Sequence, residues 1–192
     1  MRSRYLAPWR VDVEIRPTVA RPLPIRIAGL VRAMAVALDA GGAPAPAAIG
    51  LTLSDDRELA DLNERHLGHD GPTDVLSFPL LPPEAFPPHA GGRHRAAAAG
   101  ERAPAPFAGP PGGRTLLGDI VVSVERAVEQ AHAGRGGQTG DVRWSAADEL
   151  RLLVTHGTLH LCGWDHAEPD ENRRMRALEW RLLRGRYDDE PV

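Results

Sequence analysis

The alternation of apolar and polar residues predicts several short strands. Residues 11–16 read V-D-V-E-I-R, which is the period of a half-buried strand. Shorter apolar runs bounded by turn residues predict three further strands at residues 49–53, 74–80 and 118–124.

Helical spacing of apolar residues predicts five helices between and after these strands. Ile27, Leu30, Val31, Met34 and Leu38 recur at helical spacing within residues 23–38. The other helices are predicted after the capping pair Asp55–Asp56, at 124–132, at 145–162 and at 169–183. The mixed order of strands and helices indicates an α+β or mixed α/β domain on a small sheet.

Residues 81–114 do not fit a packed domain, because 23 of these 34 residues are Pro, Gly or Ala. This composition without periodicity predicts a long flexible insertion. The length of 192 residues otherwise suggests one domain over residues 1–192.

Composition limits the classes of function. A net charge of −3 is not typical of nucleic-acid binders, so any RNA contact must come from a local patch. Cys162 is the only cysteine, which excludes an internal disulfide and fits a reducing compartment. The N-terminus lacks the apolar core of a signal peptide, and no apolar stretch is long enough to cross a bilayer. We therefore expect a cytoplasmic protein without a membrane partner.

The segment H-G-T-L-H-L-C-G-W-D-H carries the clearest chemistry. His156 and His160 lie four residues apart, so on a helix they share one face, about 40° apart. Gly163 can end this helix, and the turn can return His166 to the same point. Three neutral imidazoles would hold one zinc ion with an open fourth position, where bound water has a pKa of about 7. Three unrelated histidines are the less favoured interpretation.

The histidine spacing equals that of the metzincin proteases, whose pattern is H-E-x-x-H-x-x-G-x-x-H. Here Gly157 replaces the general-base Glu, which argues against a peptidase. A glycine inside a helix costs about 1 kcal/mol relative to Ala, so it makes room either at the metal or for close packing. Cys162 points to another face and is expected to be a small core residue.

Several motifs together resemble the YbeY family of bacterial endoribonucleases. The histidine segment looks like the family signature, and Pro72 to Pro79 resembles its second motif, P-T-D-V-L-S-F-P. Further matches are Asn63, Gly118-Asp119-Ile120, Gln130-Ala131, and Met175 with Glu179 as M-x-x-x-E. The resemblance spans roughly residues 49–182, apart from the insertion.

The resemblance implies a zinc-dependent, single-strand-selective endoribonuclease. Such proteins act in 3′-end maturation of small-subunit rRNA and in ribosome quality control, with the small subunit and its assembly proteins as partners. It also implies an α+β fold in which the metal helix packs, as in zincins, on a mixed four-stranded sheet. The family often has an Arg four residues after the motif Asn, where this chain has Leu67. Arg65 lies nearby but on another side of the helix.

Other residues keep two interpretations each. Asp165 can orient a histidine or accept a proton, or it can only shape the turn. Ser77 and Asp119 lie on strands that could line a cleft, but hydrogen bonding at the strand ends explains them as well. The arginines of the last helix form either a solvated face, which is the favoured interpretation, or an RNA track. Three functions stay open: a metallo-endoribonuclease, a zinc peptidase, and a ribosome assembly factor with a structural zinc.

Overall fold

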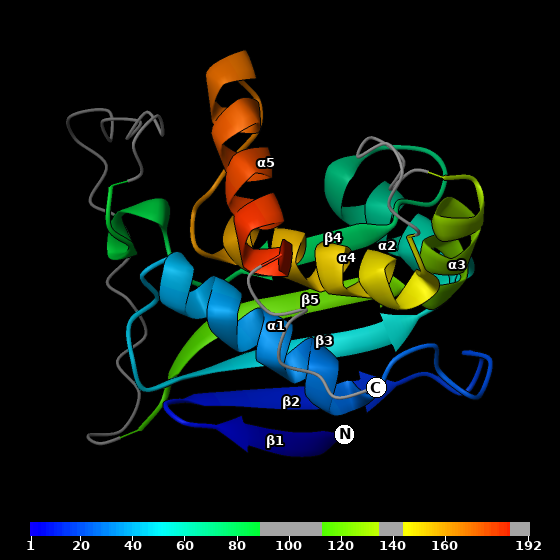
Figure 1. The fold of residues 1–192 in the computed structure, drawn as a ribbon, viewed down its shortest axis with the longest axis horizontal. Helices are drawn as coiled ribbons and strands as arrows, with labels where there is room; N and C mark the ends of the chain where they lie inside the picture. The colour runs from blue at the N-terminus through cyan, green and yellow to red at the C-terminus, as the bar shows by residue number, and fades with distance from the viewer. Residues whose placement is uncertain (89–112, 135–143, 185–192) are drawn as a thin grey trace.

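The fold is a five-stranded mixed sheet with helices on both faces. A computed structural model describes residues 1–88, 113–134 and 144–184 (Figure 1). The strands are β1 (Arg2–Leu6), β2 (Trp9–Ile15), β3 (Ala47–Ser54), β4 (Val75–Pro79) and β5 (Thr115–Ser123). The helices are α1 (Ile27–Ala40), α2 (Asp56–Leu67), α3 (Val124–His132), α4 (Ala146–Leu161) and α5 (Pro169–Arg184), with a 3-10 turn at Pro83–Ala85.

The strand order is β1-β2-β3-β5-β4. Strands β2, β3 and β5 run parallel, while β1 and β4 pair antiparallel at the two edges. The α+β class and the five helices are confirmed, but the four-stranded sheet was wrong. The missed strand is β1, whose residues are all exposed. An edge strand with no buried side has no apolar alternation to reveal it.

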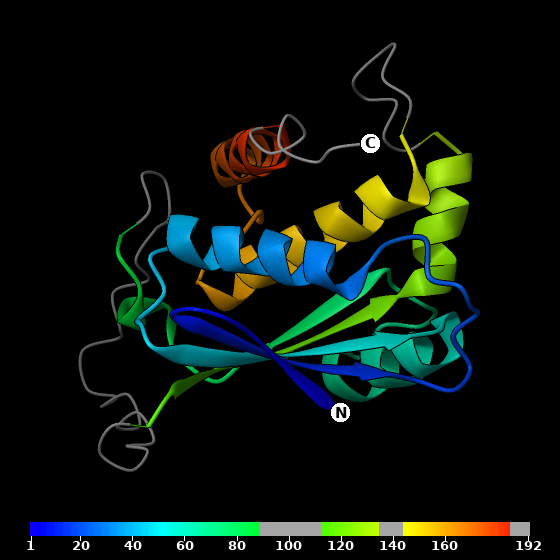
Figure 2. The same ribbon diagram turned by 60° about the horizontal axis from the view of Figure 1, so that its bottom comes forward.

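The two faces of the sheet are covered differently (Figure 2). Helices α1 and α4 pack against the main core, which includes Ile49, Leu51 and Ile120. Helix α2 packs on the other face, where Leu59 meets Leu76 and Val121. Neighbouring residues of one strand point to opposite faces, so β4 directs Val75 and Ser77 toward α4, and Leu76 and Phe78 toward α2.

Side-chain caps begin three of the helices. The Asp55 carboxylate accepts from the Glu58 backbone N–H, and Ser123 caps α3 through Arg126. Ser145 and Asp148 cap α4 reciprocally in a capping box. These are the short polar residues that satisfy unpaired N–H groups at a helix start.

The beginning of the predicted insertion is packed. Residues 81–88 include the 3-10 turn, and Phe86 is only 4% exposed within the main core. The prediction of a loose segment therefore does not apply to these residues. Residues 89–112, the greater part of the insertion, lie outside the described residues.

Candidate metal centre

Helix α4 presents its apolar side to the core and two histidines on another side. Leu150, Leu153, Val154 and Leu161 are buried. The helix ends in a Schellman motif: Trp164 N–H donates to Leu159 O and Gly163 N–H to His160 O. Gly163 has φ of +81°, which is the left-handed conformation expected for it. The chain therefore turns sharply after α4.

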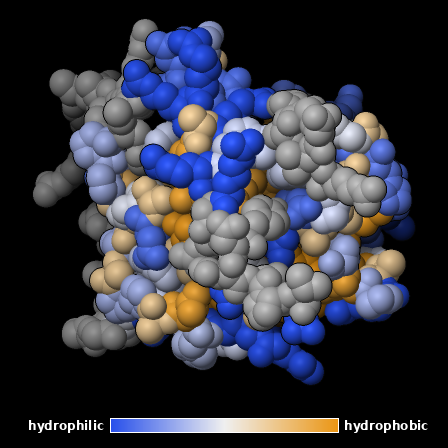
Figure 3. All heavy atoms as spheres, in the orientation of Figure 1, coloured by the Kyte–Doolittle hydropathy of each residue, from blue (hydrophilic) through white to orange (hydrophobic). Residues whose placement is uncertain are grey.

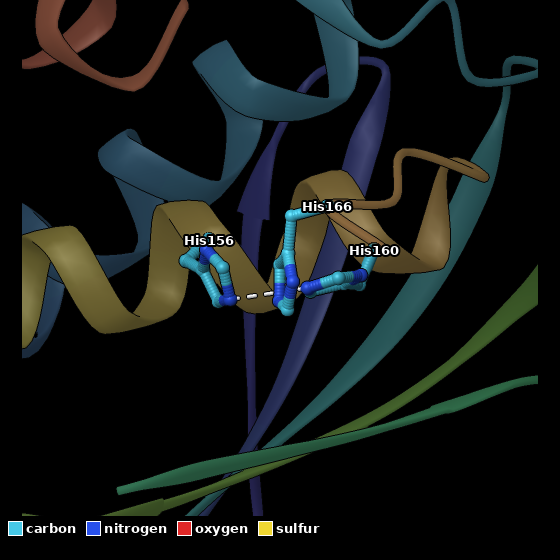
Figure 4. A group of neighbouring side chains, drawn as sticks. All are labelled: His156, His160 and His166. Atoms are coloured by element: carbon cyan, nitrogen blue, oxygen red, sulfur yellow. Dashed lines mark hydrogen bonds between the residues drawn. The ribbon is translucent and has the colours of Figure 1, made fainter. Parts of the chain in front are cut away.

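This turn brings the three histidines together (Figure 4). The Nε2 atoms of His156 and His160 lie 3.0 Å apart. The His166 ring stacks on His156 with centroids 5.4 Å apart and meets His160 edge-on at 4.9 Å. One ring nitrogen from each residue lies within 4.8 Å of the others. The predicted residues thus converge, although they come from a helix and a following turn.

The donor set fits a tetrahedral divalent ion. Nitrogens bound to zinc at about 2.0–2.1 Å would lie roughly 3.3 Å apart in a tetrahedron. The spacings above require only small side-chain movements. Burial, together with the neighbouring rings of His156 and His166, lowers the pKa of His160 to about 4. The His160 imidazole is therefore neutral at neutral pH, as a metal ligand must be.

The rings of His156 and His160 also have hydrogen-bond partners outside the cluster. His156 Nδ1 lies 2.7 Å from the Glu179 carboxylate of α5. The His160 ring hydrogen-bonds the Trp164 backbone. Sequence reasoning missed Glu179 as a site residue and noted it only within the M-x-x-x-E resemblance.

Gly157 allows α4 to approach the sheet closely. A Cβ at this position would lie 3.0 Å from Ile120 Cγ2, 3.0 Å from Ser77 Oγ and 3.1 Å from Val75 Cγ2. The Ser77 hydroxyl donates to Gly157 O at 3.0 Å. Of the two reasons considered for this glycine, close packing is therefore the one that its surroundings support. A metzincin-type Glu would collide with β4 and β5.

Ser77 and Asp119 lie on opposite faces of the sheet. Ser77 contacts the helix that carries the histidines. Asp119 is exposed and lies between the inward-facing Gly118 and Ile120 in the strand. Its side chain approaches Gly50 on the far face. Of the two, only Ser77 belongs to the surroundings of the histidines.

The residues around the turn have structural contacts. The Asp165 carboxylate accepts from the His166 backbone N–H at 2.7 Å, which supports its turn-shaping interpretation. Cys162 is fully buried in the core, and burial raises the pKa of its thiol to about 12. The expectation that Cys162 is a core residue is confirmed by its place in the main core.

The end of α2 lies on the face of the sheet opposite α4. Leu67, at the position where the family often has Arg, is 56% exposed. Arg65 is exposed and pairs with Asp61 at 3.7 Å. Asn63 is buried, and its side-chain amide donates to Gly71 O at 2.9 Å. This bond holds the segment that leads from α2 around to the edge strand β4.

The arginines of α5 are mostly solvated. Arg173, Arg174, Arg176, Arg181 and Arg184 are exposed. Arg173 pairs with Asp170, and Arg176 donates to Asn172 at 2.8 Å. The surface over the N-terminal half of this helix is hydrophilic (Figure 3). These contacts favour a solvated face over an RNA track.

The fold and the histidine cluster define an α+β protein with a candidate three-histidine metal centre. The family model described as "Endoribonuclease YbeY" matches residues 26–186. The chain therefore belongs to the YbeY family of endoribonucleases, which are hydrolases.

Two relatives with similar sequences agree with this assignment. The chain is 45% identical to Endoribonuclease YbeY of Salinispora tropica over 77% of this chain and 79% of that protein. It is 40% identical to Endoribonuclease YbeY of Thermobifida fusca over 72% of each chain. A solution structure of TM1509 from Thermotoga maritima matches with a TM-score of 0.49 and 18% identity, over 94% of this chain and 93% of that one.

No helix among the described residues is long and apolar enough to span a membrane.

Proposed function

We propose that this protein is a zinc-dependent endoribonuclease that cleaves single-stranded RNA, with one zinc ion held by His156, His160 and His166. The observation that carries the proposal is the convergence of three imidazole nitrogens within 4.8 Å in a member of an endoribonuclease family. Among the residues that the structure describes, the cluster offers three nitrogen ligands and no thiolate or carboxylate, which favours zinc among common ions.

The site is accessible on one side. His156 and His160 are partly buried, whereas His166 is exposed. A polymer can therefore reach the cluster from the side of the turn. When bound, zinc would supply an open coordination position that polarises a phosphoryl oxygen or activates a nucleophile. The protein's own part is to hold three neutral ring nitrogens in place and to leave that position open.

Peptide hydrolysis has little support from this geometry. The metzincin base would occupy position 157, where an added Cβ would lie within 3.0–3.1 Å of three side chains. These side chains belong to β4 and β5, so the helix cannot carry a larger residue there without moving. Amide cleavage by this route would lack its carboxylate.

The biological setting follows the family resemblance. We propose that the substrate is the 3′ end of small-subunit rRNA, and that the partners are the small ribosomal subunit and its assembly proteins in the cytoplasm. The same resemblance supports the preference for single strands. An assembly factor with a structural zinc would share the metal but cleave nothing.

Purified protein tests the metal and the substrate together. Elemental analysis should show about one zinc per chain, lost in a His156→Ala/His160→Ala double variant. The zinc-loaded protein should cleave single-stranded RNA but neither duplex RNA nor casein. A 2′,3′-cyclic phosphate product would show attack by the neighbouring 2′-hydroxyl. Full zinc in the double variant would refute the site, and zinc without RNA cleavage would favour the assembly factor.

A further inference from the structure

Glu179 is a buried carboxylate that faces the histidine cluster from another helix. It lies on α5 and is 7% exposed, between the buried residues Leu178 and Leu183 of that helix. Its Oε1 atom lies 2.7 Å from His156 Nδ1. The residue is thus part of the packing between α5 and α4, but its polar end is directed at a single ring nitrogen.

A carboxylate in this position is costly unless it has a partner. Burying a charge without compensation destabilises a fold, and buried carboxylates are therefore paired or close to a cation. Among the residues that the structure describes, His156 is the one side chain bonded to Glu179. An apolar residue would fill the same space between α4 and α5 without this cost. The carboxylate is explained better by what it does to His156 than by packing.

The hydrogen bond selects one tautomer of His156. A carboxylate accepts, so Nδ1 carries the proton and Nε2 keeps its lone pair. That Nε2 atom is the one 3.0 Å from His160 Nε2, where a shared ion would lie. His160 is held in a comparable way by the Trp164 backbone. Among the described residues, the His166 ring has no hydrogen-bond partner, so its position depends on the turn.

We propose that Glu179 is a positioning residue of the metal centre: it fixes the His156 ring and its tautomer, and so raises the affinity for zinc. This inference rests on the proposed zinc site. It also gives α5 a role in the site, although α5 contributes no ligand. Carboxylate partners of metal-bound histidines typically change metal affinity by about 10–100-fold.

The test measures zinc affinity by competition with a chromophoric chelator. Glu179→Ala removes the acceptor and should weaken binding by about 10–100-fold. Glu179→Gln keeps an acceptor of similar reach without the charge, so its affinity should fall between those of Glu179→Ala and wild type. Asp170→Asn, which removes an exposed carboxylate from the same helix, is the matched control and should bind zinc as wild type does.

A second readout needs no metal. Long-range ¹H–¹⁵N spectra of the metal-free protein report the tautomer of each histidine. Wild-type His156 should be protonated at Nδ1, and this preference should be reduced in Glu179→Ala. A purely structural role for Glu179 would lower the melting temperature without changing the tautomer or the zinc affinity of the folded variants.

The outcomes separate this inference from the proposed function. If folded Glu179→Ala binds zinc within about twofold of wild type, the positioning role is refuted while the zinc site stands. A proton on His156 Nε2 in the metal-free wild type would also refute it. If wild type binds no zinc at these histidines, the proposed zinc site itself fails.

Discussion

Gly157→Ala is expected to destabilise the protein, although this change usually favours a helix. Replacing an interior helical glycine by alanine gains about 1 kcal/mol. Here the added Cβ would contact Ile120, Ser77 and Val75 at 3.0–3.1 Å, and overpacking of this kind costs about 1–3 kcal/mol. Ile120 and Val75 are β-branched residues in paired strands and have little freedom to withdraw.

The overpacking cost exceeds the helix gain, so the net loss should be about 0–2 kcal/mol. At roughly 2–4 °C per kcal/mol for a domain of this size, the melting temperature should fall by up to about 8 °C. Gly29→Ala in α1 is the matched control. Its Cβ would meet Ile25 Cδ1 at 3.2 Å and Ile25 Cγ1 at 3.4 Å. The tighter contact is with the terminal methyl, which can rotate away, so this variant should be as stable as wild type or more so.

A double-mutant cycle with Ser77→Ala identifies the contact. Ser77 Oγ is one of the three crowded atoms, so the Gly157→Ala/Ser77→Ala variant should lose less stability than the two single changes added together. Unfolding by heat gives the melting temperature of each variant, and unfolding by urea gives its free energy of unfolding. The reasoning is refuted if Gly157→Ala melts at or above the temperature of Gly29→Ala, or if the two changes are strictly additive.

Three further predictions concern other parts of the chain. Replacing residues 89–112 by a short Gly/Ser linker should change the melting temperature by only a few degrees. Phe86→Ala should cost about 3–5 kcal/mol of stability, because this ring is in the core. Equal losses of stability in the two variants would contradict this prediction. Arg16 and Ser54 lower the pKa of Glu58 from 4.5, so Glu58 adds stability above about pH 4.5 that is lost as the pH falls through its lowered pKa. Glu58→Gln should therefore make the free energy of unfolding depend less on pH at acid pH, and should lower it by about 0.2–1 kcal/mol near pH 7. An unchanged dependence on pH at acid pH would count against the ion pair with Arg16. Leu67→Arg should melt like wild type, because position 67 is exposed. It should not speed RNA cleavage, because the end of α2 lies on the face of the sheet opposite the helix that carries the histidines; a folded variant that cleaves faster would mean that bound RNA contacts this face as well.

Local patterns in the sequence were sufficient for most of the elements. The caps Asp55 and Ser145 and the stop at Gly163 each follow from residues within a few positions. The three histidines could be predicted to converge for the same reason, because a helix and one turn bring them together. Strand β1 could not be found, because its exposed residues carry no pattern that separates a strand from a polar loop.

Contacts between distant segments were beyond sequence reasoning. Glu179 lies 23 residues from His156, and only the packing of α5 on α4 brings them together. The space around Gly157 depends on two strands that are distant in sequence. The positions of Leu67 and Asp119 relative to the histidines depend on which face of the sheet each occupies, which a single strand or helix does not reveal.

The most direct test of the account is a zinc titration of RNA cleavage. Metal-free protein, prepared with a chelator, should not cleave single-stranded RNA. Activity should rise with added zinc and level off at about one equivalent per chain, while the His156→Ala/His160→Ala variant stays inactive at the same zinc concentrations. Cleavage by the metal-free protein, or by the folded double variant, would contradict the claim that these histidines hold a catalytic metal.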